Sequence, residues 1–247
     1  MSELSKNKIK WIRSLRQKKH RDEEGLFILE GEKMVLEALE QRPDLIHTVV
    51  ALSNYSHRLL GADTDIITAT DDQLAQVSEL HTPNKLLAVL NKPESGRFVE
   101  KGLRLVLCDV QDPGNLGTIL RTADWFGLTE VICSRNTVDC FNEKALQSSM
   151  GSILRVNVHY TDLKSFLVNR TDTIFAADMV GENIYTASNL REGYLLMGNE
   201  GKGIPSDLDG FIHRRISIPK FGSAESLNVG VATGVILSEF ARRMSGH

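Results

Sequence analysis

Short apolar runs alternate with segments of helical periodicity along the N-terminal part of the chain, up to about Lys92. Apolar positions three and four residues apart predict helices, and short aliphatic runs between polar residues predict strands. We therefore predict a small α/β domain in this part of the chain. The expected helices cover residues 7–19, 31–41 and 71–77, and the expected strands cover residues 26–29, 47–52, 65–69 and 85–90.

A polar stretch with one proline and two glycines, residues 91–102, is the best candidate for a linker. We expect one domain over residues 1–95 and a second over residues 103–247. Short strands alternate with helices in the second, a pattern typical of a parallel sheet covered on both faces. The expected strands there are residues 104–110, 130–133, 156–159, 173–177, 194–198 and 215–218, and the expected helices are residues 116–126, 142–149, 163–169 and 227–244.

Composition is ordinary for a globular protein of 247 residues, with 41% hydrophobic and 25% charged residues. No apolar run is long enough to cross a bilayer, and residues 1–10 lack the apolar core of a signal peptide. Cys108, Cys133 and Cys140 show no CxxC spacing. That favours reduced thiols over a disulfide framework or a zinc site. We therefore expect a cytoplasmic protein that lies outside membranes and holds no metal.

The net charge of −3 argues against a generic nucleic-acid binder, which is usually basic. The distribution of charge softens this objection. Between Lys6 and Arg21 there are eight Lys and Arg residues and no acidic one. Such a stretch is able to lie along phosphates, but it is equally typical of a solvated helix face.

Three short polar motifs in the second segment each follow an apolar, strand-like run. The first, Asn115-Leu-Gly-Thr-Ile-Leu-Arg121, comes after a Pro-Gly turn at the expected start of a helix. Ligand sites in open α/β sheets form where strands end, and helix N-termini favour anionic groups. Taken alone, the motif is also explained by Asn115 as a helix cap and Arg121 as a surface cation.

The second motif, Gly198-Asn-Glu200-Gly-Lys-Gly203, has glycines that let a ligand approach the backbone. Its spacing matches neither a phosphate-binding P-loop nor the dinucleotide fingerprint, and an ordinary glycine-rich turn is the alternative. In the third motif, Glu225-Ser-Leu-Asn-Val229, Ser226 is placed to cap a long apolar helix, with Asn228 in the first turn. The preceding residues do not form the GxSxG turn of a serine hydrolase.

In combination, the three motifs resemble the SpoU/TrmH group of SPOUT RNA 2′-O-ribose methyltransferases, over about residues 103–244. Residues 144–155 are similar to the stretch that this family has between its motifs. Residues 27–36 resemble the L30e-like substrate-binding domain that many of these enzymes carry. The resemblance implies an α/β fold, with a C-terminal trefoil-knotted parallel-sheet (SPOUT) domain preceded by a small L30e-like α/β domain. It also implies a homodimer with the active site near the subunit interface.

The same resemblance implies methyl transfer from S-adenosylmethionine to a ribose 2′-hydroxyl of a structured RNA. The L30e-like domain favours 23S rRNA over tRNA. Arg121 would then orient a phosphate and stabilise developing negative charge. The implied catalytic residues are Asn115, Arg121, Glu200, Ser226 and Asn228. The implied cofactor-binding residues are Met197, Gly198, Asn199, Gly203, Ile218, Leu227 and Asn228.

Two positions depart from the family pattern. Lys220 stands where the family usually has Met, and Gly230 stands where Ser is common, which bears on cofactor-pocket packing and helix stability. A tRNA 2′-O-ribose methyltransferase and a non-catalytic RNA-binding protein of the same fold remain as alternatives. A nucleotide-dependent oxidoreductase is disfavoured, because the glycines after Val110 do not have the dinucleotide-binding spacing.

Overall fold

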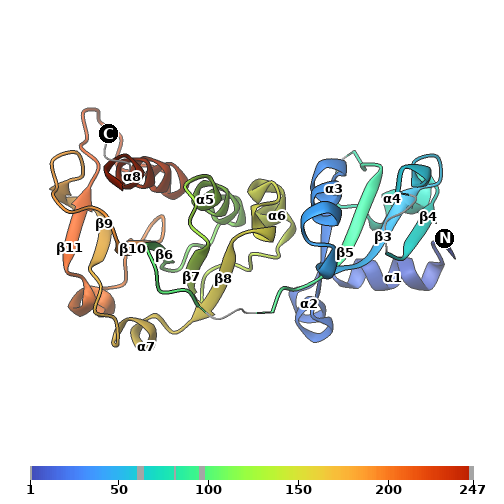
Figure 1. Ribbon diagram of the computed structural model, residues 1–247, viewed down its shortest axis with the longest axis horizontal. Helices are drawn as coiled ribbons and strands as arrows, with labels where there is room; N and C mark the ends of the chain where they lie inside the picture. The colour runs from blue at the N-terminus through green and yellow to red at the C-terminus, as the bar shows by residue number, and fades with distance from the viewer. Residues whose placement is uncertain (1, 60–63, 81, 95–97, 245–247) are drawn as a thin grey trace. The chain divides into compact units, whose positions relative to one another are not determined.

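A computed structural model describes residues 2–59, 64–80, 82–94 and 98–244 of the chain. The chain forms two compact units (Figure 1). The N-terminal unit contains residues 1–94 together with residues 141–154, and the C-terminal unit contains the rest. Residue 95, where we expect the first domain to end, and residues 245–247 lie outside the described residues.

The N-terminal unit is built on a mixed sheet with the strand order β1-β4-β3-β5-β2. The β3 strand pairs in parallel with β4 and antiparallel with β5, and helices contact the strands of the sheet. The strands are β1 (Ser2–Glu3), β2 (Leu26–Glu30), β3 (Ile46–Leu52), β4 (Ile66–Ala69) and β5 (Leu86–Asn91). The helices are α1 (Lys6–Ser14), α2 (Lys18–Glu24), α3 (Glu32–Gln41), α4 (Asp71–Val77) and α6 (Glu143–Ser149), with 3-10 turns at Pro43–Leu45, Ser56–Leu59 and Ser152–Leu154.

The single helix expected over residues 7–19 is wrong, because the chain forms α1 and α2 with a break between them. At the break, the guanidinium of Arg16 donates to the carbonyl oxygens of Val77 (3.2 Å) and Ser78 (2.7 Å). Arg21 donates to the carbonyl oxygen of Arg16 at 2.6 Å. These hydrogen bonds satisfy backbone carbonyl groups at the turn between the two helices. The helix prediction used only the spacing of apolar residues, so it took no account of them.

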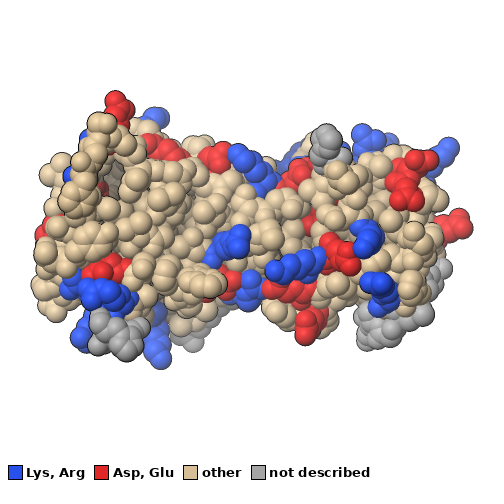
Figure 2. Space-filling model, turned by 90° about the horizontal axis from the view of Figure 1, so that it is seen from above, with Lys and Arg blue, Asp and Glu red and all other residues tan. Residues whose placement is uncertain are grey.

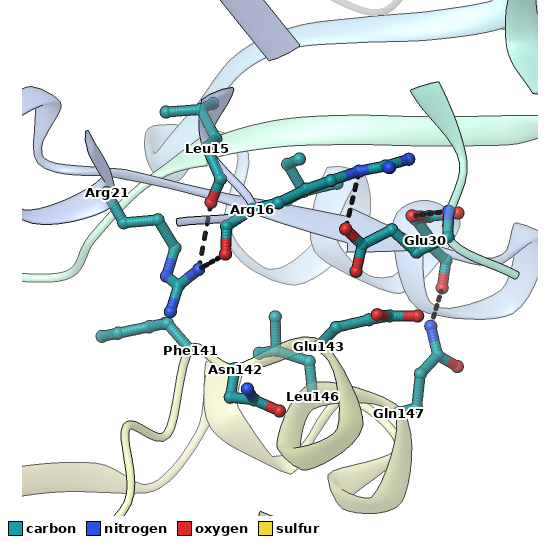
Figure 3. Close-up of a pocket in the computed structure, with 11 residues that line it drawn as sticks. Leu15, Arg16, Arg21, Glu30, Phe141, Asn142, Glu143, Leu146 and Gln147 are labelled. Carbon is teal, nitrogen blue, oxygen red and sulfur yellow. Dashed lines mark hydrogen bonds and ion pairs between the residues drawn. The ribbon is translucent and has the colours of Figure 1, made fainter. Parts of the chain in front are cut away.

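A pocket in the N-terminal unit collects three glutamates and two arginines (Figure 3). The carboxylate of Glu79 pairs with Arg16 at 2.6 Å. Glu30 accepts hydrogen bonds from the Ser78 hydroxyl at 2.6 Å and from the Glu79 amide at 3.0 Å. Glu143, at the start of α6, brings a third carboxylate to this pocket. Three carboxyl groups therefore lie close together in a partly buried pocket.

The C-terminal unit contains a sheet in which every pair of neighbouring strands is parallel, over the residues that the structure describes. The strand order is β11-β9-β10-β6-β7-β8. Strands β6, β7 and β8 therefore follow one another towards one edge of the sheet, and the later strands lie on the other side of β6. The strands are β6 (Leu103–Leu107), β7 (Glu130–Ser134), β8 (Asn157–Thr161), β9 (Ile174–Asn183), β10 (Gly193–Met197) and β11 (Arg214–Ser217). The helices are α5 (Pro113–Trp125), α7 (Leu163–Leu167) and α8 (Val229–Met244), with a 3-10 turn at Ser206–Phe211.

The expected α/β class and parallel sheet are confirmed. The trefoil knot implied by the resemblance stays a prediction. Two strand lengths were predicted wrongly. The strand expected over residues 104–110 ends at Leu107, because Asp109 has a left-handed backbone with φ of 56°. The strand expected over residues 173–177 continues to Asn183, where its exposed end pairs with β11 across a register shift.

Helices α5 and α8 lie side by side (Figure 1), and a glycine permits their close approach. A Cβ at Gly230 would come within 3.1 Å of the Thr118 methyl group and 3.2 Å of the Asn228 side-chain oxygen. Contacts this short are tighter than ordinary van der Waals packing, so a larger residue would require the Thr118 and Asn228 side chains to shift by a few tenths of an ångström. Gly230 is therefore a packing residue in this chain.

Charge on the surface is mixed. On the face drawn in Figure 2, basic and acidic side chains are interspersed. This distribution agrees with the small net charge of −3. Within the described part of the chain, no helix combines the length and apolarity needed to span a membrane.

Candidate active site

The first motif begins at the N-terminus of α5, directly after the turn that follows β6. Asp112 is the N-cap, and its carboxylate accepts a hydrogen bond from the Asn115 amide at 2.9 Å. Pro113 occupies the first turn, where its missing N–H is not needed. The backbone amide of Asn115 is therefore engaged by the cap, and its side chain remains available for other contacts.

The side chain of Asn115 joins all three motifs. Its Nδ2 donates to the Glu200 carboxylate at 2.8 Å, and its Oδ1 accepts from Asn228 Nδ2 at 2.8 Å. These residues are far apart in the sequence, and each belongs to a different motif. The loops after β6, after β10 and before α8 are thus connected at the carboxyl edge of the parallel sheet, where α/β proteins bind ligands.

The second motif folds into a small closed loop. Asn199 and Gly203 exchange two backbone hydrogen bonds of 2.9 Å. The Asn199 side-chain oxygen accepts from the amides of Gly201 and Lys202 at 3.0 Å, while its Nδ2 donates to the Asp109 carbonyl at 2.7 Å. Asn199 therefore stabilises its own loop and fixes that loop to the end of β6.

Gly198 allows this loop to close. A Cβ at Gly198 would stand 2.4 Å from the carbonyl carbon of Gly203. Any side chain at this position would force the backbone apart, because Cβ atoms do not approach other atoms so closely. Glycine at residue 198 is thus a requirement of the loop geometry.

The third motif caps α8 with a different residue from the expected one. The Asn228 side-chain oxygen accepts from the amides of Gly230 at 2.9 Å and Val231 at 3.3 Å. Asn228 is therefore the N-cap, and the interpretation of Ser226 as the cap is wrong. Ser226 is exposed and makes no described hydrogen bond in the structure. An Asn cap also leaves its amide group free to reach Asn115.

Arg121 is an exposed cation on α5. Among the residues that the structure describes, its guanidinium has no hydrogen-bond or ion-pair partner. It lies six residues beyond Asn115, which is about 9 Å along the helix axis. The structure brings Asn115, Glu200 and Asn228 into one hydrogen-bonded group, and it leaves Arg121 and Ser226 outside that group.

Asp109 was not recognised from the sequence as part of this arrangement. Its Oδ1 accepts a hydrogen bond from the Ser134 hydroxyl at 2.6 Å, and its amide donates to the same hydroxyl oxygen at 2.9 Å. A left-handed backbone at a non-glycine residue is uncommon and often marks a functional site. The available signal was an Asp directly after a buried strand, which is not specific.

Cys108 precedes Asp109 and is buried at the end of β6. Burial and the neighbouring Asp109 carboxylate raise the pKa of its thiol to about 12. The thiolate is the reactive form of cysteine, so Cys108 stays protonated and is not a nucleophile for this site. Over the described residues, no group of three His, Cys, Asp or Glu side chains is arranged to hold a metal ion.

The expected cofactor-binding residues fall on two segments. Met197 is buried at the end of β10, and the backbone of residues 198–203 forms the closed loop that follows. Ile218 is half-buried just after β11, and Leu227 is 51% exposed next to the Asn228 cap. The Asn228–Asn115–Glu200 hydrogen bonds connect the second segment to the first.

The parallel sheet with three loops joined at its carboxyl edge defines an α/β protein with a ligand site at that edge, and comparison with known families assigns the family. Residues 102–238 match the SpoU rRNA Methylase family, and residues 6–88 match the MRM3-like substrate binding domain. The chain belongs to the SpoU rRNA methylase family.

Individual relatives match over nearly the whole chain. The 23S rRNA (guanosine(2553)-2′-O)-methyltransferase RlmP of Bacillus subtilis is 32% identical, over 95% of this chain and 96% of the relative. The structure of an RNA methyltransferase assigned to the TrmH family, from Porphyromonas gingivalis, superposes with a TM-score of 0.88 at 35% identity, covering 98% of this chain and 100% of that one. An AdoMet-bound rRNA methyltransferase from Sinorhizobium meliloti gives a TM-score of 0.85 at 29% identity, covering 99% and 97%.

Proposed function

We propose that this protein transfers a methyl group from S-adenosylmethionine to a ribose 2′-hydroxyl of ribosomal RNA. The observation that carries the proposal is the hydrogen-bonded group of Asn115, Glu200 and Asn228, which joins three motif loops at one edge of a parallel sheet. Membership of the SpoU rRNA methylase family supports the reaction. The B. subtilis relative is named as a 23S rRNA 2′-O-methyltransferase, which supports 23S rRNA over tRNA as the substrate.

The loops fit a nucleoside cofactor. The closed Gly198–Gly203 loop presents backbone groups without side chains at its glycines, so a ligand is able to approach closely. Leu227 and Phe221, 51% and 95% exposed, supply apolar surface on the other segment that a purine would cover. S-adenosylmethionine supplies the reactive methyl group, and Met197, Gly198, Asn199, Gly203, Ile218, Leu227 and Asn228 are the residues proposed to hold it.

The protein's own contribution is to position and to stabilise. Arg121 stays protonated at neutral pH, since an arginine pKa lies above about 12, so it is a poor base. Its free guanidinium binds a phosphate next to the target ribose and stabilises negative charge that develops on the 2′-oxygen. Asn115, Glu200 and Asn228 hold the surrounding loops, and the exposed Ser226 hydroxyl is proposed to contact the ribose. Fixing both reactants in this way supplies on the order of 7–11 kcal/mol.

The active unit is proposed to be a homodimer with the site near the subunit interface. Large apolar side chains flank the contact between α5 and α8 and remain exposed in the single chain. Trp125 is 83% exposed and Val231 is 53% exposed. Trp125 lies four residues after Arg121, hence on the same face of α5. A second copy covering this face would therefore lie beside the proposed catalytic arginine.

A cytoplasmic location is proposed from the state of the cysteines. All three are free thiols and buried. Proteins in oxidising compartments commonly pair such residues in disulfides, whereas cytosolic proteins keep them reduced. The substrate is a structured RNA with an accessible nucleotide, since the 2′-hydroxyl is what distinguishes RNA from DNA.

The test of the proposal is transfer of labelled methyl from S-adenosylmethionine to unmodified 23S rRNA and, in parallel, to unmodified tRNA. Substitution Arg121→Ala is expected to lower kcat by about 10²- to 10³-fold, as when a group that stabilises developing charge is removed. Cofactor affinity, measured by calorimetry, should stay unchanged. Arg191→Ala is the matched control, because Arg191 is exposed and precedes β10, at the opposite edge of the sheet.

Each outcome has a distinct meaning. Label on a single rRNA ribose supports both the chemistry and the substrate. Label on tRNA alone contradicts the substrate class, and full turnover by Arg121→Ala contradicts the role of that arginine. Failure of the wild-type chain to bind S-adenosylmethionine would mean a non-catalytic RNA-binding protein.

A further inference from the structure

The eight basic residues between Lys6 and Arg21 divide into two groups in the structure. One group is neutralised or buried: Lys8 pairs with Asp65, Arg16 with Glu79, Lys18 with Asp22 and Lys19 with Glu23, and buried Arg21 donates to backbone carbonyls. The other group is Lys6, Lys10 and Arg13. All three are exposed, and none has a side-chain partner among the residues that the structure describes.

The three unpaired cations form a stripe along α1. Their spacings of four and three residues place them on one face of the helix. Ile9 and Ile12, on a neighbouring face, are buried in the core of the N-terminal unit. The stripe of Lys6, Lys10 and Arg13 therefore spans about 10 Å of helix axis and is exposed beside the buried face.

This arrangement is unfavourable for the isolated helix. Lys6 opens α1, and the first turn contains no acidic residue, so positive charge stands at the positive end of the helix dipole. Lys6 and Lys10 are like charges at i and i+4, which destabilise a helix by about 0.2–0.5 kcal/mol per pair. Packing does not require these side chains, and nothing within α1 neutralises them.

Neighbouring elements do not neutralise the stripe either. The adjacent helix α4 begins with Asp71 and Asp72, and β1 ends with Glu3. None of these three carboxylates forms an ion pair with the stripe in the described structure. A polyanionic partner would supply the missing charge.

We propose that the stripe of Lys6, Lys10 and Arg13 binds the phosphate backbone of the RNA substrate. This inference rests on the proposed function insofar as the partner is RNA. One strand of duplex DNA advances about 3.4 Å per phosphate, so on this scale the length of the stripe is comparable to the spacing of about three phosphates. Contacts of this kind hold the RNA in place without reading its bases.

The experiment compares two triple variants of the full chain that carry the same change in charge. The stripe variant is Lys6→Gln, Lys10→Gln, Arg13→Gln. The matched control is Lys8→Gln, Lys18→Gln, Lys19→Gln, which removes cations that are already paired. Glutamine has nearly the helix propensity of lysine and arginine. Thermal unfolding should therefore show the stripe variant folded, with a Tm equal to or above that of the wild type.

The measurement is the affinity for an unmodified 23S rRNA transcript as a function of salt. For the stripe variant, the slope of log K against log salt should become less negative by about 2–3, close to one phosphate for each cation. The ratio of the wild-type affinity to the affinity of the stripe variant should accordingly fall about 15- to 60-fold between 50 and 200 mM salt. The control variant should keep nearly the wild-type slope, and cofactor affinity should stay unchanged in both.

Two results would overturn the inference: a stripe variant with the wild-type slope, or equal weakening in the stripe and control variants, which would indicate a general effect of net charge. Failure of the proposed function is distinguishable from these results. If the wild type binds rRNA through the stripe but transfers no methyl group, the methyltransferase proposal fails and the stripe stands.

Discussion

At the scale of single residues, hydrogen-bond chemistry fixes the direction of every bond around Asn115. The Glu200 carboxylate can only accept, so Asn115 must present its NH₂ group there. The amides at the start of α8 can only donate, so Asn228 turns its oxygen to them and its NH₂ group to Asn115. Position 115 therefore requires a short side chain with one hydrogen-bond donor and one acceptor, and asparagine has both.

The direction of these bonds gives a prediction. Asn115→Asp puts a carboxylate oxygen against Glu200, which replaces a hydrogen bond to a charged group with repulsion. Such bonds contribute about 1.5–3 kcal/mol, so kcat/KM should fall about 10- to 100-fold. The double variant Asn115→Asp, Glu200→Gln restores a donor opposite an acceptor and should recover most of that loss. A double variant no more active than Asn115→Asp, at unchanged Tm, would show that this bond does not support catalysis.

Sequence reasoning singled out Asn115, Glu200 and Asn228, which the structure joins by hydrogen bonds, because each lies in a motif whose combination is specific. It did not find Asp109, because the left-handed backbone and the bond from Asn199 depend on how distant segments meet. Ser226 and Asn228 are both good capping residues and lie two positions apart. Only the geometry at the start of α8 distinguishes between them.

At the scale of elements, apolar periodicity predicted most helices and strands, since burial of one face determines them. It failed between α1 and α2, where Arg16 donates hydrogen bonds to the carbonyl oxygens of Val77 and Ser78. It also failed at the end of β9, whose last residues are exposed and are held by pairing with β11. In both places the chain is shaped by hydrogen bonds to segments distant in the sequence.

The start of α6 carries a prediction about pH. Glu143 lines the pocket of the N-terminal unit (Figure 3). Burial, followed by the hydrogen bond and negative charge of Glu79, raises the pKa of Glu143 from 4.5 to about 8. The folded state therefore keeps a proton that the unfolded state releases above pH 4.5. Stability falls as the pH rises from about 4.5 towards 8, because unfolding releases this proton.

Glu143→Gln removes this titration and keeps the shape of the side chain. The Tm of the variant should exceed that of the wild type at pH 8 and approach it near pH 5. Glu40→Gln, at an exposed position of α3, is the control and should leave the pH dependence unchanged. Parallel Tm curves for wild type and Glu143→Gln from pH 5 to 8 would mean that Glu143 has an ordinary pKa.

At the scale of the whole molecule, the polar stretch of residues 91–102, with one proline and two glycines, predicted a division of the chain into two parts. The grouping of residues 141–154 with the N-terminal unit was not predictable in this way. Phe141 packs its ring against Phe27, with 4.7 Å between the ring centroids, and Gln147 donates to the Glu30 carbonyl at 3.2 Å. Contacts of this kind leave no periodic signal, because each depends on one pair of residues far apart in the sequence.

The proposed homodimer leads to the prediction at the largest scale. A charge placed in a buried apolar interface has no partner there, so Trp125→Glu or Val231→Glu should separate the subunits. Both side chains are exposed in the single chain, so neither change should unfold it. Val168→Glu, at a position 61% exposed beyond the end of α7, is the control and should leave the dimer intact.

Sedimentation velocity and methyl transfer, measured on the same samples, test this arrangement. If the site lies beside the interface, the monomeric variants should lose turnover together with dimerisation, because the partner would no longer cover the face of α5 that carries Arg121. A wild-type chain that sediments as a monomer at full activity would refute the dimer. Monomeric variants with full turnover would leave the dimer standing and show that each subunit completes its own active site.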